Sequence, residues 1–220
     1  MYLYGAWAFP EGVGRGDVDL QVIVGQALSD SEKSALGNLH NTLAQQFPSV
    51  AGDGLDAYYI LLIEARGTTP PRHQLLPDVI DSSWALHRAH ILAGRCIVLY
   101  GPDPRGVYTS PSWEDLETAL ESEHDYVRRH LRDYPAYCVL NLCRLIQSYA
   151  TRNVVLSKYG SAKWAREVYP QSEPIVDAAL RVYEKRATTT HEALLGDKIG
   201  EFYEFACGQM RRIRGEGQAA

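Results

Sequence analysis

The 220-residue sequence lacks the cysteine patterns that would assign it to a metal-binding or redox class. Its four cysteines are Cys96, Cys138, Cys143 and Cys207, and no two of them have Cys-x-x-Cys spacing. That spacing is typical of zinc knuckles and of thioredoxin-type motifs, so both classes are disfavoured. We expect reduced thiols in the core of an intracellular protein.

The sequence also lacks a long apolar run and an excess of basic residues. No run approaches the roughly 20 residues that span a bilayer, and no signal-type segment opens the chain. With 22 Lys and Arg against 27 Asp and Glu, the net charge is −5, whereas phosphate-backbone binding usually demands a basic surplus. We therefore expect a cytoplasmic protein that binds neither a membrane nor a long nucleic acid. Its acidic balance suits a cationic small molecule.

The chain has an ordinary globular composition, with 45% hydrophobic residues, and its length allows one large domain or two small ones. Short apolar runs separated by Gly and Pro dominate the first hundred residues, whereas helical periodicity dominates residues 112–213. This change predicts an α+β protein. An α/β domain with a small mixed sheet spans residues 1–105, and an all-α helical bundle spans residues 106–220.

The first domain is expected to alternate strands and helices. Ser29 and Glu32 have capping-box spacing, which predicts the start of the first helix. Trp84 is expected in the core. The expected strands are 2–4, 18–24, 56–64 and 96–99, and the expected helices are 31–47 and 78–93.

Two aspartates on one expected strand carry the clearest chemical signal. Asp17 and Asp19 are two residues apart, so their carboxylates project to the same face, at high electrostatic cost unless a cation lies between them. They share that face with Gln21 and Ile23, at the polar mouth of an otherwise buried strand. Mg²⁺ favours a few carboxylates plus phosphate oxygens, so this pair predicts an ion that orients a nucleoside triphosphate.

A third acid and a small-residue turn extend the pattern. Asp56 opens the next long strand, where it would lie beside the pair and could bind metal or accept a proton from an acceptor hydroxyl. Gly5 and Ala6 are small enough for backbone amides to approach phosphates. The alternative is structural: Asp17 and Asp19 form a solvated edge-strand pair, and Asp56 merely begins a strand.

These residues resemble the nucleotidyltransferase superfamily of polymerase-beta-like fold, and more closely the streptomycin and spectinomycin (aminoglycoside) adenylyltransferases. The resemblance makes residues 1–105 the nucleotidyltransferase domain. It implies transfer of AMP from ATP to a hydroxyl of an aminoglycoside-like acceptor, with Mg²⁺, and a role in antibiotic resistance. In the helical half it rests on segments 99–102, 113–120, 139–144, 157–165 and 174–183.

The resemblance also implies roles for particular residues. Asp17 and Asp19 match the metal-binding acids, and Asp56 matches a catalytic glutamate that is one methylene longer. Two of the family's serines are replaced by Ala6 and Gly16. The family also has a helix before the first strand, so we expect either a minimal domain here or a start further upstream.

Arg144, Lys158 and Tyr183 match family positions that contact the nucleotide, and their surroundings can be judged separately. Arg144 lies in an apolar helical stretch and needs an anionic partner, either phosphate or an acid such as Asp133 or Glu184. Lys158 follows an apolar segment at a loop-to-helix junction, where it could reach a triphosphate or be a solvated surface lysine. Tyr183 could stack a base or be a core tyrosine.

The acceptor site is less defined. Glu121, Glu123 and Asp133 could bind a polycationic sugar or could be ordinary helix-surface charges. His87 and His90 have a spacing that could bind metal, but no third ligand is evident, so we interpret them as structural.

The sequence thus predicts a nucleotidyltransferase. Two alternatives remain open: a nucleotide-binding module without turnover, and a transferase that acts on a protein or RNA hydroxyl.

Overall fold

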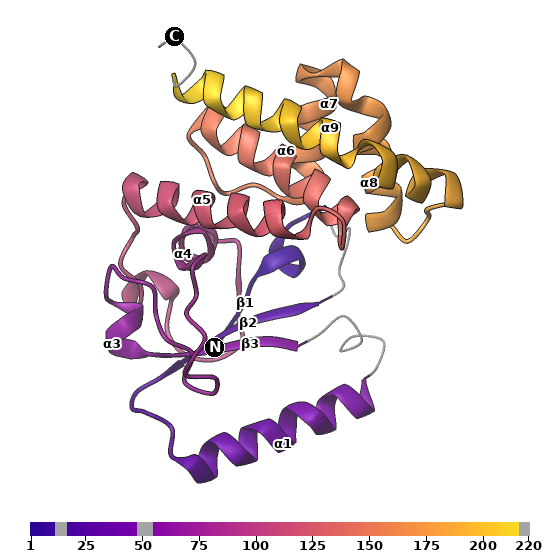
Figure 1. Cartoon of the computed structure of the whole chain (residues 1–220). Helices are drawn as coiled ribbons and strands as arrows, with labels where there is room; N and C mark the ends of the chain where they lie inside the picture. The colour runs from indigo at the N-terminus through magenta and orange to yellow at the C-terminus, as the bar shows by residue number, and fades with distance from the viewer. Residues whose placement is uncertain (12–16, 48–54, 216–220) are drawn as a thin grey trace. The chain divides into compact units, whose positions relative to one another are not determined.

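The computed structural model describes residues 1–11, 17–47 and 55–215 (Figure 1). The chain forms two compact units, Met1–Ala119 and Leu120–Ala220, and the division falls within helix α5 (Trp113–His130). The domain boundary at residue 105 stays a prediction. The two units are described separately below.

A small mixed sheet forms the centre of the first unit. Within the described residues, its strands follow the order β3-β2-β1-β4. Strands β2 and β3 are parallel, whereas β1 is antiparallel to both β2 and β4. This arrangement confirms the predicted mixed sheet. The strands are β1 (Tyr2–Leu3), β2 (Val18–Val24), β3 (Leu55–Leu61) and β4 (Ile97–Val98).

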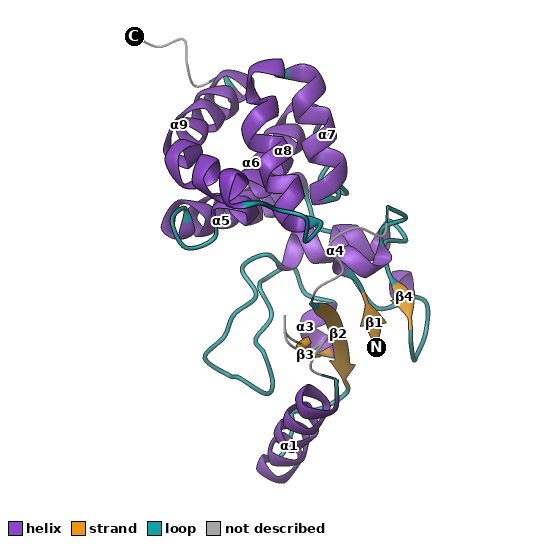
Figure 2. Ribbon diagram, turned by 90° about the vertical axis from the view of Figure 1, so that its right-hand side faces the viewer, coloured by secondary structure: helices purple, strands orange, loops and turns teal. Residues whose placement is uncertain are grey.

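Helices lie on both faces of this sheet (Figures 1 and 2). On one face, Ile91 of α4 (Trp84–Leu92) belongs to a buried cluster with Tyr2, Tyr4 and Ile60 from the strands. On the other face, His40 of α1 (Asp30–Gln46) shares a hydrogen bond of 2.9 Å with Tyr59 of β3. The core of the unit is therefore on the α4 face.

Helix α1 begins as predicted. Ser29 is its N-cap, the Ser29 Oγ accepts a hydrogen bond from the Glu32 N–H, and the Ser29 N–H donates to the Glu32 carboxylate at 2.7 Å. These two bonds satisfy backbone donors that the helix itself cannot pair. The predicted capping box is confirmed.

Two predicted boundaries were wrong. The strand expected to continue to Glu64 ends at Leu61, because the chain turns there into the short helix α3 (Leu62–Ala65). The run of apolar residues had hidden this change, since periodicity cannot separate a short buried strand from a short buried helix. The helix expected to begin at residue 78 begins only at Trp84, after a loop in which Ile80 bridges to Arg72. Trp84 itself is buried, as predicted.

A buried arginine connects α4 to the loop after α3. Arg88 is 1% exposed, and its guanidinium donates to the carbonyl oxygens of Gly67 at 2.5 Å and Glu64 at 2.8 Å. The guanidinium carbon also lies 4.4 Å from the centroid of the Trp84 ring. Because a buried cation is costly unless its donors are paired, these carbonyls fix the position of α4 relative to β3 and α3.

The second unit is helical throughout its named elements, as predicted. Helix α6 packs against α7, α8 and α9. Its middle, from Cys138 to Ile146, is buried except at Arg144, which is why that stretch of the sequence is so apolar. The helices are α6 (Pro135–Thr151), α7 (Lys158–Val168), α8 (Glu173–Tyr183) and α9 (Thr189–Arg214), with the short η3 (Pro170–Ser172) before α8.

The predicted α+β class is confirmed by these elements. In the part of the chain that the structure describes, no helix combines the length and the apolar character needed to cross a bilayer. All four cysteines are free, and Cys138 and Cys143 are buried.

Replacement of Arg88 by methionine should lower the free energy of unfolding by about 3 kcal/mol, because the apolar chain fits the space but removes two charge-assisted hydrogen bonds to part-buried carbonyl oxygens. Urea denaturation monitored by circular dichroism measures this change. The matched control is Arg105→Met, since Arg105 is exposed and its partner is the exposed Asp103. An Arg88→Met variant as stable as Arg105→Met would contradict the role assigned to this side chain.

Candidate functional site

The predicted acids come together at the start of the two parallel strands. Asp19 of β2 is in register with Asp56 of β3, so their Cα atoms are direct neighbours across the ladder. Asp17 immediately precedes β2, and its charge acts on Asp56. The face of β2 that carries Asp19 continues into the buried Gln21, so the acids stand at the polar end of the strand face that α4 covers.

The backbone of Gly5 approaches the Asp19 carboxylate closely. Gly5 has φ of +65°, and a Cβ built on it would lie 1.7 Å from the Asp19 Oδ2. Both facts require glycine, because a side chain would be strained at this φ and would overlap the carboxylate. Gly5 is the first residue of the turn η1 (Gly5–Ala8), which also contains Ala6. Gly5 therefore brings this backbone turn against the acid cluster.

Backbone hydrogen bonds hold Asp17 and Asp19 in place. The Tyr4 N–H donates to the Asp19 carbonyl oxygen at 3.0 Å, and the Trp7 indole N–H donates to the Asp17 carbonyl oxygen at 2.8 Å. Hydrogen bonds thus join the segment around Gly5 to the backbone of both acids. Gly16, predicted to lie at the nucleotide, is outside the described residues.

Burial and crowding of like charges determine the electrostatics of this cluster. Burial raises the pKa of Asp56, and the charges of Asp17 and Asp81 raise it further, while His87 lowers it. Burial also raises the pKa of Tyr4, with contributions from Asp19, Asp81 and Asp56. Several carboxylates therefore share one partly buried region, where a cation would relieve their repulsion.

The sequence interpretation missed Asp81. Its carboxylate is buried, accepts the Ser83 N–H at Oδ1 (3.0 Å) and lies 3.1 Å from the His87 Nδ1 at Oδ2. Asp81 follows a loop and belongs to no strand, so no periodicity marked it. The one available signal was its spacing of six residues from His87, which becomes informative only once α4 is known to begin at Trp84.

The acids offer the oxygen donors that Mg²⁺ prefers. Among the described residues, no group of three or more His, Cys, Asp or Glu side chains is already close enough to hold a metal ion. The register of Asp19 and Asp56 and the raised pKa of Asp56 nevertheless fit a divalent cation, because a cation and phosphate oxygens would complete a partial set of carboxylate ligands.

In the second unit, Arg144 has an acidic partner. Its guanidinium lies 3.4 Å from the Glu123 carboxylate of α5, and both side chains are largely buried. The expected partners Asp133 and Glu184 were wrong, because Asp133 pairs with His130 and Glu184 pairs with Arg186. Helix α5 places Glu123 beside Arg144, a contact between distant segments that spacing could not reveal.

Lys158 lies at the first position of α7, after the N-cap Ser157, which confirms the predicted loop-to-helix junction. Its ammonium nitrogen is 4.1 Å from the ring centroid of Tyr137. Burial raises the pKa of Tyr137 to about 12, and the charge of Arg144 acts on the same hydroxyl in the opposite direction. Lys158 and Arg144 therefore both lie near Tyr137. Tyr183 is the last residue of α8 and is half-buried.

The acids considered for acceptor recognition have intramolecular partners. Glu121 pairs with Arg214 at 2.9 Å, and Glu123 and Asp133 pair as described above. The side chain of Glu121 is 57% exposed, whereas that of Glu123 is 16% exposed. Glu121 thus behaves as a surface charge, whereas Glu123 is half-buried.

Residues 110–209 match the family described as aminoglycoside adenylyltransferase, C-terminal domain. The fold is similar to that of spectinomycin adenyltransferase AAD(9) from Enterococcus faecialis, crystallised with ATP and spectinomycin, with a TM-score of 0.73 over 94% of this chain and 90% of that chain. Residues 110–209 thus match the C-terminal domain of the aminoglycoside adenylyltransferases, and the protein is a nucleotidyltransferase.

The sequence likeness within this family is low. Identity to the enterococcal structure is 16%, so that comparison establishes the shared fold and assigns no residue of this nucleotidyltransferase. No curated protein matches the chain by sequence. The resemblance drawn from the sequence motifs is therefore confirmed at the level of family, and the roles of the individual residues stay predictions.

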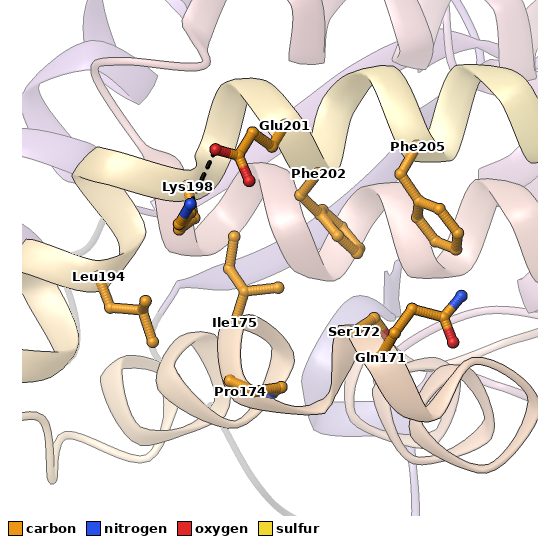
Figure 3. A pocket seen from close by; sticks show the side chains of 9 residues that line it. All are labelled: Gln171, Ser172, Pro174, Ile175, Leu194, Lys198, Glu201, Phe202 and Phe205. Atoms are coloured by element: carbon orange, nitrogen blue, oxygen red, sulfur yellow. Dashed lines mark hydrogen bonds and ion pairs between the residues drawn. The ribbon is translucent and has the colours of Figure 1, made fainter.

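A separate cavity of about 330 Å³ lies within the helical unit of this nucleotidyltransferase (Figure 3). Leu194, Phe202 and Phe205 of α9 face Ile175 of α8 across it, and Lys198 pairs with Glu201 at 2.8 Å. None of the predicted nucleotide-contacting residues lines it. The remaining lining residues are Gln171, Ser172 and Pro174.

Gly5→Ala should lower the free energy of unfolding of this nucleotidyltransferase by about 3 kcal/mol, because it combines left-handed backbone strain with the displacement of the Asp19 carboxylate. Chemical denaturation measures the loss. Repeating the change in an Asp19→Ala background removes the overlapping oxygen, so the same substitution should then cost roughly half as much. Equal costs in the two backgrounds would show that the carboxylate does not lie against Gly5.

Proposed function

We propose that this enzyme transfers AMP from ATP to a hydroxyl group of an aminoglycoside-like acceptor in a Mg²⁺-dependent reaction. The observation that carries the proposal is the register of Asp19 with Asp56, and the charge of the preceding Asp17 acts on Asp56. Three carboxylates at the ends of two parallel strands provide oxygen ligands for the metal of a bound nucleoside triphosphate.

In this proposal Asp17, Asp19 and Asp56 hold the magnesium ion, which neutralises charge on the phosphates when it is bound. Gly5 and Ala6 form the turn whose backbone approaches the triphosphate, and Gly16 is proposed to contact the nucleotide as well. The close approach of Gly5 to the Asp19 carboxylate supports this role, since it leaves the turn directly beside the proposed metal ligands.

Arg144, Lys158 and Tyr183 are proposed to contact the nucleotide. Arg144 and Lys158 lie near the same tyrosine ring within the helical unit, so their charges act on a common region. Guanidinium and ammonium groups are the usual side-chain partners of phosphate oxygens. The Glu123 carboxylate holds Arg144 in place.

The reaction then consists of an in-line displacement. The acceptor oxygen attacks the α-phosphorus of ATP, the bond from that phosphorus to the bridging oxygen breaks, and pyrophosphate leaves with the bonding electrons. The protein contributes positioning and charge neutralisation, which supply most of the catalysis in transfers of this kind.

The acceptor class is proposed from the family and from charge. The family is defined by aminoglycoside adenylyl transfer, and the enterococcal relative was crystallised with spectinomycin. The net charge of −5 favours the approach of a cationic acceptor. Antibiotic modification in the cytoplasm is the corresponding proposed role.

Calorimetric titration with ATP and Mg²⁺ tests the metal site. The wild-type enzyme should bind, and the double variant Asp17→Ala, Asp19→Ala should weaken binding at least about 100-fold, because the variant loses two charged ligands of the metal. Asp30→Ala is the matched control, since Asp30 is a fully exposed acid on α1. A folded wild-type protein that binds no nucleoside triphosphate would overturn the proposed function.

Arg144→Met tests the cation contact. Loss of a charge-assisted hydrogen bond to phosphate should raise the Kd for ATP by roughly 10-fold. Arg128→Met should leave the Kd unchanged, because Arg128 is an exposed arginine whose partner is Asp125. Equal affinities of the two variants would remove Arg144 from the nucleotide site while leaving the metal site intact.

A further inference from the structure

We propose that the aromatic ring of Tyr137 positions the Lys158 ammonium group for contact with the phosphates of the nucleotide. This role rests on the proposed function and deepens it, because it adds a residue that neither the sequence motifs nor the comparisons assign to the nucleotide site. Tyr137 acts through Lys158 and is therefore a positioning residue.

Lys158 occupies a position that is unfavourable for a cation within its own helix. It is the first residue of α7, directly after the N-cap Ser157, whose Oγ accepts the Gly160 N–H at 2.9 Å. The N-terminal end of a helix carries partial positive charge, and the first turn of α7 contains no acid to offset it. A lysine at this position therefore needs stabilisation from outside α7.

The Tyr137 ring supplies part of that stabilisation. The Lys158 Nζ lies over the ring, 4.1 Å from its centroid, which is within the distance at which the negative face of an aromatic ring attracts a cation. Tyr137 lies in the first turn of α6, and α6 packs against α7. The contact thus joins the beginnings of two packed helices.

The ring is itself held in place and uncharged. The Tyr126 ring of α5 packs against it edge-to-face, with the centroids 5.9 Å apart and the planes at 71°. Burial raises the pKa of the Tyr137 hydroxyl to about 12, so the side chain is neutral near pH 7. The ammonium group therefore interacts with an aromatic face and not with a phenolate.

This arrangement restrains Lys158 without neutralising its charge. An ammonium group has three N–H donors, so one side can rest on the ring while the others donate to phosphate oxygens. Arg144 is restrained differently, since its partner at 3.4 Å is the Glu123 carboxylate. The ring leaves the full positive charge of Lys158 for an anionic ligand.

Restraint before binding favours affinity. A lysine side chain has several rotatable bonds, and ordering it when a ligand binds is costly. Because the ring already limits the positions of the Lys158 ammonium group in the folded protein, the nucleotide has less of the side chain to order. The affinity for ATP should therefore depend on the ring of Tyr137 and not on its hydroxyl.

Calorimetric titration with ATP and Mg²⁺ tests this dependence. Tyr137→Leu should raise the Kd for ATP about 5-fold, because it removes the ring that holds the ammonium group. Tyr137→Phe keeps the ring and should leave the Kd within about twofold of wild type. The matched control is Tyr159→Leu, since the Tyr159 ring holds a different cation of α7, the Lys163 ammonium group at 4.4 Å, and its loss should leave the Kd unchanged.

A double-mutant cycle shows whether Tyr137 acts through Lys158. In a Lys158→Met background, Tyr137→Leu should change the Kd less than about twofold, because no ammonium group remains to be positioned. A 5-fold effect that persists in this background shows that Tyr137 acts by another route and overturns the inference.

A carbon-13 NMR spectrum of lysine-labelled protein gives a readout that needs no nucleotide. The protons on the Lys158 Cε, assigned through Lys158→Met, should be shifted upfield by the ring beneath them. Tyr137→Phe should keep this shift, and Tyr137→Leu should lose it while its melting temperature stays close to wild type. A wild-type signal at the position of exposed lysines overturns the inference, whether or not the leucine variant folds well.

The two proposals fail in different ways. Equal Kd values for wild type and Tyr137→Leu, with normal binding of ATP to wild type, overturn the role of Tyr137 alone. A folded wild-type protein that binds no nucleoside triphosphate overturns the proposed function and this role with it.

Discussion

The parallel pairing of β2 with β3 is the constraint on which the site depends. Side chains alternate between the two faces of a strand, so a slip of one residue in this register would move Asp56 to the opposite face from Asp19. The apolar residues that follow the acids fix the register, because Ile23 and Ile60 must both reach the core beneath α4. Hydrophobic burial at one end of the strands thereby sets the spacing of charge at the other.

Helix α4 links this core to the site chemistry. Its apolar side contributes Ile91 to the core, while its first turn carries His87 against Tyr4 and Asp81. Arg88 ties the same turn to the carbonyls after α3, and burial lowers the pKa of its guanidinium from the ordinary value. A single helix therefore joins the packing of the sheet to the position of a polar pair, and neither can shift without the other.

Local patterns in the sequence predicted what depends on local geometry. The strand at residues 18–24 and the capping box at Ser29 depend on residues a few positions apart, and both were confirmed. The adjacency of Asp19 and Asp56 was also predicted, because the next long strand in the sequence was expected to lie beside β2. The partner of Arg144 and the contact of Asp81 with His87 depend on how separate segments pack, so spacing could not supply them. The family resemblance was confirmed, while the assignments that it implies for single residues await experiment.

The two strands that flank β1 in the sheet lie at very different separations from it in the sequence. Tyr2 pairs on one side with Gln21, a near neighbour in sequence, and on the other with Val98, at the far end of the unit. Closing a long loop is slow, since its entropic cost precedes the contacts that repay it. We therefore expect the sheet to assemble from β2 outward, with β4 added last. The acids would then be in place early in folding, before the sheet edge at β4 closes.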